Sequence, residues 1–447
     1  MKLSRYNYFT ENKEKDLLLF NTLQGTSSFL KIPKEKKEAV TAVLRSSKPI
    51  LELQEDEIYT ALVKHGYILP DTADEEAKLR SIYLEKVADP GLHLTLIPTE
   101  QCNFRCKYCY ESFPNNVMSR ETQNAVLLFL KKNMNKYASL QVSWFGGEPL
   151  LGLEAIESMS QEMKKICAFH RKPFTASITT NGFLLEPEVF KRLLHCNVLY
   201  YQITIDGTKD IHDMQRPHEK LPVSTYDAVV GNLQRIKREV KNSTFRITIR
   251  SNFSKLHMDR IEEYKETFYQ MFGDDKRFLF FVRPVMDWGG DSIDAFKDNL
   301  VDESGLDTFY EKLMATDCRL NYIYDGFLDN AGGVCEAGQK NSFVITTDGS
   351  IYKCTCNFED CPQAKIGQLE ANGCMNLEKE AQNQWLCSFS HCTKDCFYAP
   401  ICLRDACSAV RVLKRDTKEK CPLEKRNLSK ILQLLDAENN AFRRIDA

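Results

Sequence analysis

Six short apolar segments alternate with helical segments along the middle of this chain, and this alternation limits the fold more than any other feature of the sequence. The segments rich in β-branched and aromatic residues cover 93–98, 140–145, 175–180, 198–205, 245–250 and 278–285. Helical periodicity is predicted between them, over 120–136, 153–169, 187–195, 225–240 and 259–272. Strands that alternate with helices form a parallel sheet that helices cover on both faces. Six such units fall short of a closed barrel of eight, so the sequence predicts an α/β fold with a partial (β/α)6 barrel.

The chain before this barrel has a different character. With 447 residues the protein is long enough for two or three domains, and we expect the boundaries to define 1–90, 91–290 and 291–447. The first part has no cysteine. Its pattern predicts two strands in 17–32 around a turn at Gly25, followed by helices over 35–46, 55–67 and 73–88. This order favours a small winged-helix-like module that ends in a linker helix.

The last part is rich in cysteine and in loop-forming sequence, and its final helix is predicted over 422–444. Its periodic apolar sequence is too short for a conventional core, so we expect metal clusters to stabilise it. Eleven of the 17 cysteines lie between Cys335 and Cys421. Thiols in a reducing compartment stay available for metals, and this bunched distribution favours metal ligation over disulfides.

Charge and hydropathy exclude two classes of partner. The net charge is −2, without the basic excess that nucleic-acid binding needs. No apolar run reaches the ~18 residues of a membrane-spanning helix. The N-terminal sequence, MKLSRYNYFTENKEKD, lacks the apolar stretch of a signal peptide. We therefore expect a cytoplasmic protein that binds neither nucleic acid nor a membrane.

Three cysteines directly follow the first predicted barrel strand. Cys102, Cys106 and Cys109 form a CxxxCxxC pattern within TEQCNFRCKYCYE. Four thiolates saturate a [4Fe–4S] cluster, whereas three leave one iron open to the amino and carboxylate groups of a small molecule. A tetrahedral zinc site with a fourth ligand from elsewhere is the alternative that spacing alone leaves open.

The cysteine pattern, with the aromatic Tyr108 before its last cysteine, resembles the signature of the radical S-adenosylmethionine (radical SAM) superfamily. Further matches follow the next four strands. The second strand ends in Gly146-Gly147-Glu148-Pro149, which resembles that family's GGEP motif for the methionyl amino group. Thr180 and Asn181, Asp206, and Arg250 and Asn252 end the third, fourth and fifth strands, where family members contact S-adenosylmethionine.

The resemblance implies both a cofactor and a reaction. Cys102, Cys106 and Cys109 would be the catalytic ligands of a [4Fe–4S] cluster that binds S-adenosylmethionine. The reduced cluster would split the sulfonium and yield a 5′-deoxyadenosyl radical that abstracts a hydrogen atom from substrate. A flavodoxin- or ferredoxin-type protein would supply the electron.

The later cysteines resemble the SPASM extension of radical SAM enzymes, which holds two auxiliary [4Fe–4S] clusters and would bring the total to three. The family pattern assigns one cluster to Cys335, Cys354 and Cys407, and the other to Cys392, Cys396, Cys402 and Cys421. The run CxxxCx5Cx4C is one residue longer at each outer gap than the usual pattern, so Cys387 is an alternative ligand. The first cluster would take its fourth ligand from Cys356, Cys361 or Cys374, or stay open to a substrate thiolate. Zinc-ribbon sites are the alternative for this region.

A small wing-like module before such a barrel resembles the maturases of ribosomally made peptides. The module would bind the leader of a precursor peptide by β-augmentation, or else only buttress the barrel. The leading hypothesis is a maturase that installs thioether cross-links between cysteine sulfur and carbon. Carbon–carbon cross-linking and epimerisation are rivals.

Two further readings remain. One is an anaerobic sulfatase-type maturase that makes formylglycine. In that branch an Asp commonly follows the auxiliary-cluster cysteine, whereas here Thr355 follows Cys354, with Asp348 and Glu336 as candidate bases. The other alternative is not an enzyme but a zinc-binding adaptor protein.

Overall fold

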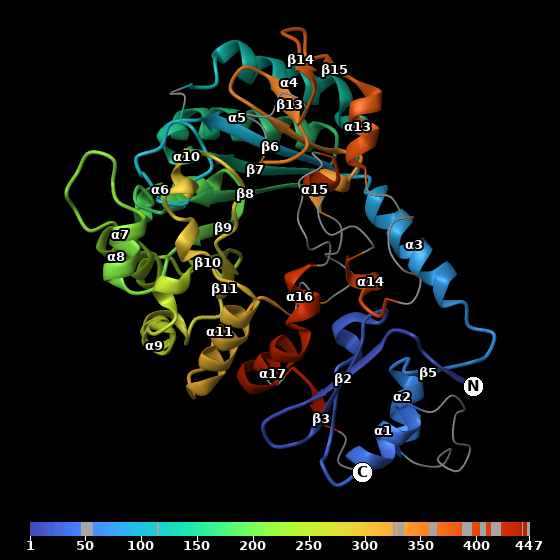
Figure 1. Ribbon diagram of the computed structural model, residues 1–447. Helices are drawn as coiled ribbons and strands as arrows, with labels where there is room; N and C mark the ends of the chain where they lie inside the picture. The colour runs from blue at the N-terminus through green and yellow to red at the C-terminus, as the bar shows by residue number, and fades with distance from the viewer. Residues whose placement is uncertain are drawn as a thin grey trace.

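The computed structural model describes most of the chain. The described residues are 1–45, 57–113, 116–324, 328, 335–356, 364–386, 396–402, 408–412, 422–439 and 441–444. Figure 1 shows a large α/β body, from light blue to yellow, and a smaller blue module at the N-terminal end. None of the described helices is both long and apolar enough to cross a membrane.

Six parallel strands form the centre of the large body and confirm the predicted partial barrel. They are β6 (Leu92–Thr99), β7 (Leu140–Gly146), β8 (Phe174–Thr180), β9 (Val198–Thr204), β10 (Arg246–Phe253) and β11 (Phe278–Pro284). Each pairs in parallel with the strand that follows it in sequence. The barrel stays open, because β12 rather than β11 lies beside β6.

Helices connect these strands and cover the outer face of the sheet (Figure 1). They are α4 (Arg120–Asn133), α5 (Leu153–Phe169), α6 (Pro187–His195), α7 (Lys209–Gln215), α8 (Thr225–Glu239) and α9 (Ile261–Phe272). The sequence predicted all of them except α7, which has only seven residues of mixed polarity. Ser224 caps α8 as expected, since its side chain accepts from the N–H of Asp227.

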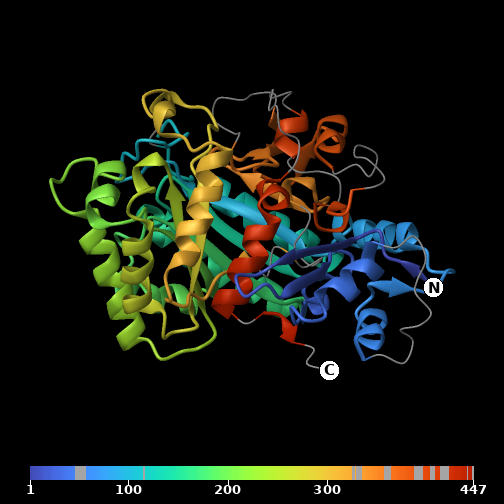
Figure 2. The same cartoon turned by 60° about the horizontal axis from the view of Figure 1, so that its bottom comes forward.

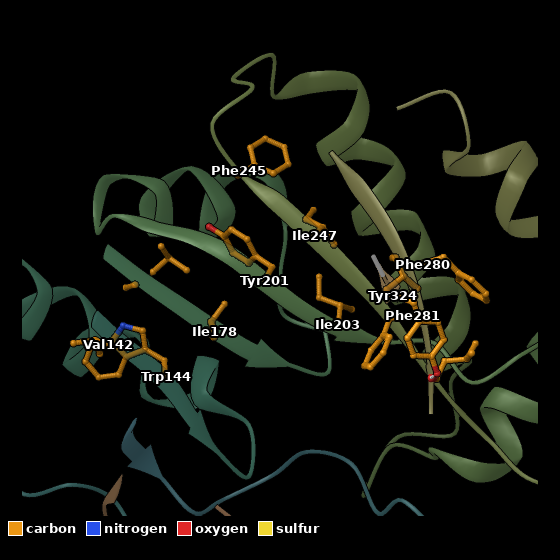
Figure 3. Close-up of a cluster of buried hydrophobic side chains, with 14 of the residues drawn as sticks. Val142, Trp144, Ile178, Tyr201, Ile203, Phe245, Ile247, Phe280, Phe281 and Tyr324 are labelled. Atoms are coloured by element: carbon orange, nitrogen blue, oxygen red, sulfur yellow. Dashed lines mark hydrogen bonds between the residues drawn. The ribbon is translucent and has the colours of Figure 1, made fainter. Parts of the chain in front are cut away.

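The two faces of the sheet differ, and here the expectation that helices cover both is wrong. In β8 the residues Ala176 and Ile178 are buried, while Thr175, Ser177 and Thr179 between them are only half-buried. Figure 3 shows the buried side, where Trp144, Ile178 and Ile203 come from neighbouring strands. Each such side chain contributes about 1.5–3 kcal/mol of hydrophobic stabilisation. The opposite face is polar and lines the inside of the barrel, where Ser143 and Ser177 hydrogen-bond at 2.9 Å.

The sheet continues into the C-terminal part of the chain, where loops were expected. The added strands are β12 (Ser342–Ile345), β13 (Ser350–Tyr352), β14 (Lys365–Leu369) and β15 (Met375–Leu377). β12 pairs in parallel with β6, and the other three follow as an antiparallel meander. Strands of three to five residues are too short for a periodicity signal.

The N-terminal module is a three-stranded antiparallel sheet packed on helices. Its main elements are β2 (Asn7–Glu11), β3 (Leu17–Asn21), β4 (Leu30–Ile32), α1 (Lys37–Arg45), α2 (Glu57–Lys64) and α3 (Glu75–Val87). A small pair, β1 (Lys2–Leu3) and β5 (Ile68–Leu69), completes it. The module has its own hydrophobic cluster around Leu19, Ile32 and Leu62. The sequence missed β2, whose residues NYFTE are mostly polar.

The C-terminal part also contains several helices and one short strand. They are α10 (Asp291–Asp294), α11 (Glu303–Ala315), α13 (Lys379–Trp385), α14 (Ala399–Cys402), α15 (Ser408–Val412), α16 (Leu423–Arg426), α17 (Leu428–Asn439) and β16 (Arg443–Arg444). Ile431, Leu432 and Leu435 of α17 are fully buried in the main hydrophobic core. The expectation that this part lacks a conventional core is therefore wrong for its described residues.

Helix α17 lies between the barrel and the N-terminal module, as Figures 1 and 2 both show. On the barrel side, Glu438 forms an ion pair with Lys265 of α9, whose side chain is fully buried. Lys265 also donates to the carbonyl oxygen of Leu313 at 2.8 Å. On the other side, Asp436 accepts from Asn12 and Lys31, at 2.9 Å each. The chain end continues the contact, because β16 pairs in parallel with β4.

The buried pair of Lys265 and Glu438 makes α17 a stability element. We expect Glu438→Gln to lower the free energy of unfolding by about 3 kcal/mol, because it leaves a buried ammonium group without its counter-charge. Lys430→Gln on the same helix removes an ion pair with Glu311 whose glutamate is exposed, and should change the value by less than about 1 kcal/mol. Urea denaturation measures both. Equal effects of the two substitutions would contradict this role.

Candidate active site

The three cysteines of the CxxxCxxC pattern lie in the loop that follows β6, at the carboxyl-terminal edge of the barrel. Three backbone hydrogen bonds hold this loop against the segment after α7. Arg105 N donates to Pro217 O at 3.0 Å, and Lys107 N donates to Gln215 O at 2.9 Å. In the opposite direction, Glu219 N donates to Asn103 O at 2.7 Å. The segment 215–219 is therefore part of the site, although the sequence analysis did not select it.

Burial controls the acidity of the three thiols. It raises the pKa of Cys102 to about 12, with a further increase from the nearby charge of Glu148. Burial also raises the pKa of Cys106, and that of Cys109 well above the ordinary value. Such thiols stay protonated at neutral pH until a cation binds them.

The donor set fits an iron–sulfur cluster. Cys106 also raises the pKa of Cys102 and of Cys109, and Cys102 raises the pKa of Cys109, so the three thiols lie near one another. No three His, Cys, Asp or Glu side chains among the described residues are already gathered at metal-binding distance, so the loop offers the donors without a preformed cage. Soft thiolate ligands that share one desolvated loop suit iron–sulfur or zinc chemistry.

Gly146 and Gly147 allow the end of β7 to touch the cysteine loop. Gly146 has φ +121°, and a Cβ atom there would lie 2.4 Å from the carbonyl oxygen of Thr99. A Cβ atom on Gly147 would lie 2.4 Å from the carbonyl oxygen of Gln101. These obstacles are backbone atoms, which cannot turn aside as a side chain does. Only glycine fits at either position, so both predicted glycines have a structural reason beside the cysteines.

Glu148 joins three parts of the site. Its side chain is fully buried and accepts from Thr180 Oγ1 at 2.7 Å and from Asn181 N at 2.7 Å. It also accepts from Leu150 N at 3.0 Å, at the start of the short 3₁₀ turn that begins with Pro149. Burial raises the pKa of Glu148, and these hydrogen bonds counteract the increase. Through these hydrogen bonds, the Glu148 side chain holds the end of β7 next to the end of β8.

Asn181 links Glu148 to the cysteine loop. Its side-chain amide donates to Asn103 Oδ1 at 2.7 Å. The motif residues at the ends of β7 and β8 are therefore linked to the residue that follows Cys102.

Tyr108 is the meeting point of the other predicted residues. Its hydroxyl donates to the buried carboxylate of Asp206, after β9, and accepts from Asn252 Nδ2 at 3.1 Å. Asp206 also accepts from the backbone N–H of Asn252 at 2.8 Å. Arg250 Nε donates to Asn252 Oδ1 at 2.8 Å. The structure thus brings the ends of β9 and β10 to the tyrosine between two of the cysteines.

Arg216 is a residue that the sequence analysis missed. Its guanidinium donates to Tyr108 Oη at 2.8 Å and lies 3.9 Å from a carboxylate oxygen of Asp206. It is buried, and its positive charge lowers the pKa of Cys106 against the effect of burial. Arg216 follows α7, which the periodicity did not reveal. Its sequence context, HDMQRP, offered no signal of a buried cation.

The described C-terminal cysteines differ in their positions and in their exposure to solvent. Cys354 follows β13, and Cys356 N donates to its sulfur at 3.4 Å. The phenol of Tyr110, next to Cys109, lies beside the thiol of Cys356, and each of the two groups affects the pKa of the other. Cys335 and Cys374 are exposed, whereas Cys396 is buried and Cys402 half-buried at the end of α14. The remaining candidates, Cys361, Cys387, Cys392, Cys407 and Cys421, lie outside the described residues.

Three further cysteines, Cys167, Cys196 and Cys318, lie outside both cysteine-rich segments. Cys167 and Cys196 are buried in the hydrophobic core. Cys318 is less covered.

The part of the chain that contains this site is similar to a known protein family. The Radical SAM superfamily model matches residues 96–264, which span the cysteine loop and the strands β7 to β10. A cysteine-type anaerobic sulfatase-maturating enzyme of Clostridium novyi is 28% identical over 337 residues, 69% of this chain and 85% of that protein. A GTP 3′,8-cyclase of Aquifex aeolicus is 25% identical over 295 residues, 62% of this chain and 85% of that protein.

A solved structure shares the fold. It is native anSMEcpe with bound AdoMet and a Cp18Cys peptide, with a TM-score of 0.57 and 19% identity. The match covers 78% of this chain and 99% of that one.

The backbone contact at Gly147 gives a direct test of the site. We expect Gly147→Ala to displace the cysteine loop and to lower the iron bound after anaerobic reconstitution at least about tenfold. Gly231→Ala is the matched control, because a Cβ atom on this glycine meets nothing within 4 Å. Iron analysis and circular dichroism measure loading and folding. Normal iron loading in a folded Gly147→Ala protein would contradict the assigned contact.

Proposed function

This chain is an enzyme with a radical SAM domain, and we propose that it is a maturase that installs thioether cross-links in a ribosomally made precursor peptide. The observation that carries this proposal is the contact between Tyr110 and Cys356. It brings Cys356, and with it Cys354, next to the residue that follows Cys109. A substrate cysteine and a radical-generating site can therefore meet in one place.

The radical SAM fold implies S-adenosylmethionine and a [4Fe–4S] cluster, and the residues present fit both. Cys102, Cys106 and Cys109 would hold the cluster, which would supply the electron that splits S-adenosylmethionine into methionine and a deoxyadenosyl radical. Gly146, Gly147 and Pro149 shape the turn beside it, while Glu148, Thr180 and Asn181 fix the ends of β7 and β8.

The chain's own residues determine the charge around the cofactor position. Arg216 supplies a buried cation opposite the negative charge of Asp206, and Tyr108 bridges the two. Arg250 and Asn252 extend this network along β10. The buried guanidinium lowers the pKa of Cys106 and so favours the deprotonated, metal-binding form of that thiol.

We also propose the two auxiliary [4Fe–4S] clusters that the cysteine spacing suggests. The hydrogen bond from Cys356 N to the sulfur of Cys354 supports Cys356 as a fourth ligand of the first cluster, or as a neighbour that a substrate thiolate replaces. Cys374 is exposed in the turn between β14 and β15, which makes it a poorer candidate. Cys335 and Cys407 would complete the first cluster, and Cys392, Cys396, Cys402 and Cys421 would hold the second.

A peptide substrate is supported by two findings. The Clostridium relative is a sulfatase-maturating enzyme, and anSMEcpe holds a bound peptide. About a fifth of this chain has no counterpart in anSMEcpe, a share similar to that of the N-terminal module. We propose that the N-terminal module serves to dock a leader, and that a flavodoxin- or ferredoxin-type protein delivers the electrons.

Formylglycine formation is the second candidate, favoured by the sulfatase-maturating relative. It needs a base near the oxidised carbon. Asp348, one of the candidates, accepts from Thr346 Oγ1 at 2.7 Å and from Ser350 N at 3.0 Å in the β12–β13 turn. Burial acts against ionisation, but these hydrogen bonds lower the pKa of Asp348 overall, which suits a turn carboxylate better than a base. Thr355 occupies the position after Cys354, so thioether formation remains our first proposal.

The number of iron atoms per chain distinguishes a protein with one [4Fe–4S] cluster from a protein with three. We expect about twelve irons per anaerobically purified chain, because each [4Fe–4S] cluster contributes four. Cys106→Ala should remove about four irons and abolish deoxyadenosine formation, and Cys354→Ser should remove about four others. Cys374→Ser is the control and should leave the iron unchanged. About four irons in the unaltered chain would contradict the auxiliary clusters, and zinc alone would favour an adaptor.

The mass and the thiol content of the modified peptide identify the bond that the enzyme forms. We expect reduced enzyme with S-adenosylmethionine to remove one hydrogen pair from the precursor peptide encoded beside it for each cysteine consumed. The product should retain its sulfur, and the consumed cysteines should resist alkylation by iodoacetamide. Tandem mass spectrometry measures both. Loss of sulfur would instead identify formylglycine, uptake of solvent deuterium would identify epimerisation, and a hydrogen pair lost with all thiols still alkylated would identify carbon–carbon cross-linking.

A further inference from the structure

Two buried histidines lie against the turn of Asp206 and Gly207, which follows β9. His212 of α7 is fully buried, and His257, in the turn after β10, is 3% exposed. Asp206 N donates to Nδ1 of His212 at 3.1 Å. Gly207 has φ +74°, and a Cβ atom there would lie 2.6 Å from Cδ2 of His257, so this ring packs directly on the turn. The two imidazoles therefore contact the backbone of the residue whose carboxylate accepts from Tyr108.

The hydrogen bonds of the two rings place their protons. Nδ1 of His212 accepts from a backbone N–H, so the proton of this ring is on Nε2. Nδ1 of His257 accepts from Ser254 N at 2.9 Å, in a reciprocal capping box with that serine. Burial lowers the pKa of both histidines, and the charge of Arg216 lowers that of His212 further. Both rings are therefore neutral at neutral pH and act through hydrogen bonds and packing.

Packing alone does not account for a histidine at position 212. Nε2 of His212 and Oε1 of Gln215, three positions later on α7, are buried and have no hydrogen-bond partner among the described residues. A buried polar atom without a partner destabilises a fold, whereas an apolar side chain of similar size would fill the same space without that loss. The property that the imidazole has and an apolar side chain lacks is an acceptor for Asp206 N.

This acceptor completes the attachment of Asp206. Its buried carboxylate accepts from the backbone N–H of Asn252 at 2.8 Å and from the hydroxyl of Tyr108. Both of these bonds hold the side chain, and the bond to His212 holds the backbone of the same residue. The next residue is a glycine, whose backbone can turn more freely than that of any other residue. Without His212 the direction of the Asp206 carboxylate would depend on the side-chain bonds alone.

We propose that His212 is a positioning residue for S-adenosylmethionine: it holds the amide of Asp206 so that the carboxylate stays directed at the cofactor. This inference rests on the proposed contact between Asp206 and the cofactor, and it adds a residue that does not itself touch the cofactor. His257, packed on Gly207, limits the movement of the same turn.

Two substitutions separate the hydrogen bond from the packing. An asparagine side chain places its oxygen near the position of Nδ1, whereas a glutamine side chain places its amide near the position of Nε2. His212→Asn therefore keeps an acceptor for Asp206 N, and His212→Gln removes it. We expect His212→Gln to weaken binding of S-adenosylmethionine to the reconstituted full chain at least about tenfold, and His212→Asn to change it less than about threefold.

Hydrogen exchange of the Asp206 amide gives a measurement that needs no cofactor. His212→Gln should speed this exchange at least about tenfold, and His212→Asn should change it less than about threefold. The exposed His195 at the end of α6 provides the matched control, and His195→Asn should change neither exchange nor affinity. The iron bound after anaerobic reconstitution should be the same in all three variants. Equal effects of the two His212 substitutions, or a loss of iron in proportion to the loss of affinity, would overturn the proposal.

The unaltered chain supplies a further test that does not depend on the folding of any variant. Nitrogen-15 NMR of labelled histidine should show His212 as a neutral ring with its proton on Nε2. A proton on Nδ1, or a charged ring at neutral pH, would overturn the proposal.

Asp206→Asn separates this inference from the contact on which it rests. We expect it to weaken binding of S-adenosylmethionine at least about tenfold, because a neutral amide replaces a buried carboxylate. If Asp206→Asn weakens binding and His212→Gln does not, the positioning role of His212 is wrong and the cofactor contact stands. If neither weakens binding, the contact of Asp206 is wrong and the proposal falls with it. No peptide is present in these measurements, so failure to form a thioether would leave their outcome unchanged.

Discussion

The close approach of two backbones at Gly146 and Gly147 is the contact on which the rest of the site depends. The end of β7 lies directly against Thr99 and Gln101, the residues that lead from β6 into the cysteine loop. Glu148 N donates to Gln101 O at 2.8 Å, so the contact is bonded as well as close. Because β7 is a rigid, buried strand, it holds the start of the loop in one place. The carboxylate of Glu148 then extends the constraint to β8 through Thr180 and Asn181.

A second constraint is electrostatic and lies at the other end of the same loop. Tyr108, Asp206 and Arg216 form a buried network in which one cation faces one carboxylate and acts on the thiol of Cys106. Burial alone would disfavour every charged form here, as the raised pKa values of the cysteines show. Arg216 makes the negative forms less unfavourable, and its hydrogen bond to Tyr108 fixes the place of its own charge. The charge of Arg216 thus favours the thiolate of Cys106, which is the form that binds a metal.

Sequence reasoning found the strands of the barrel because each buries an apolar segment long enough to be recognised. It found the cysteines and the Gly-Gly-Glu-Pro turn because their spacing is chemical information in itself. It missed Arg216, whose importance comes from a fold contact with Tyr108, 108 positions away in sequence. It missed β12 to β15 and β16 because such short strands are defined by their partners. It also read the barrel strands as covered on both faces, since serine and threonine on the inner face interrupt the apolar pattern only weakly.

Helix α17 joins the barrel to the N-terminal module. Asp436 and Gln433 bond to the N-terminal module, and Glu438 bonds to α9 of the barrel, so one helix fixes the module relative to the barrel. A peptide docked on the N-terminal module, as we propose, would then have to span a set distance to reach the cysteine loop. An extended chain covers about 3.3 Å per residue, so that distance determines how many residues must separate the docked segment from the first one that enters the barrel. Holding the peptide also raises its local concentration at the barrel mouth. In the proposed arrangement the choice of the modified residue would follow from spacing along the peptide, and the barrel itself would need few contacts that are specific for sequence.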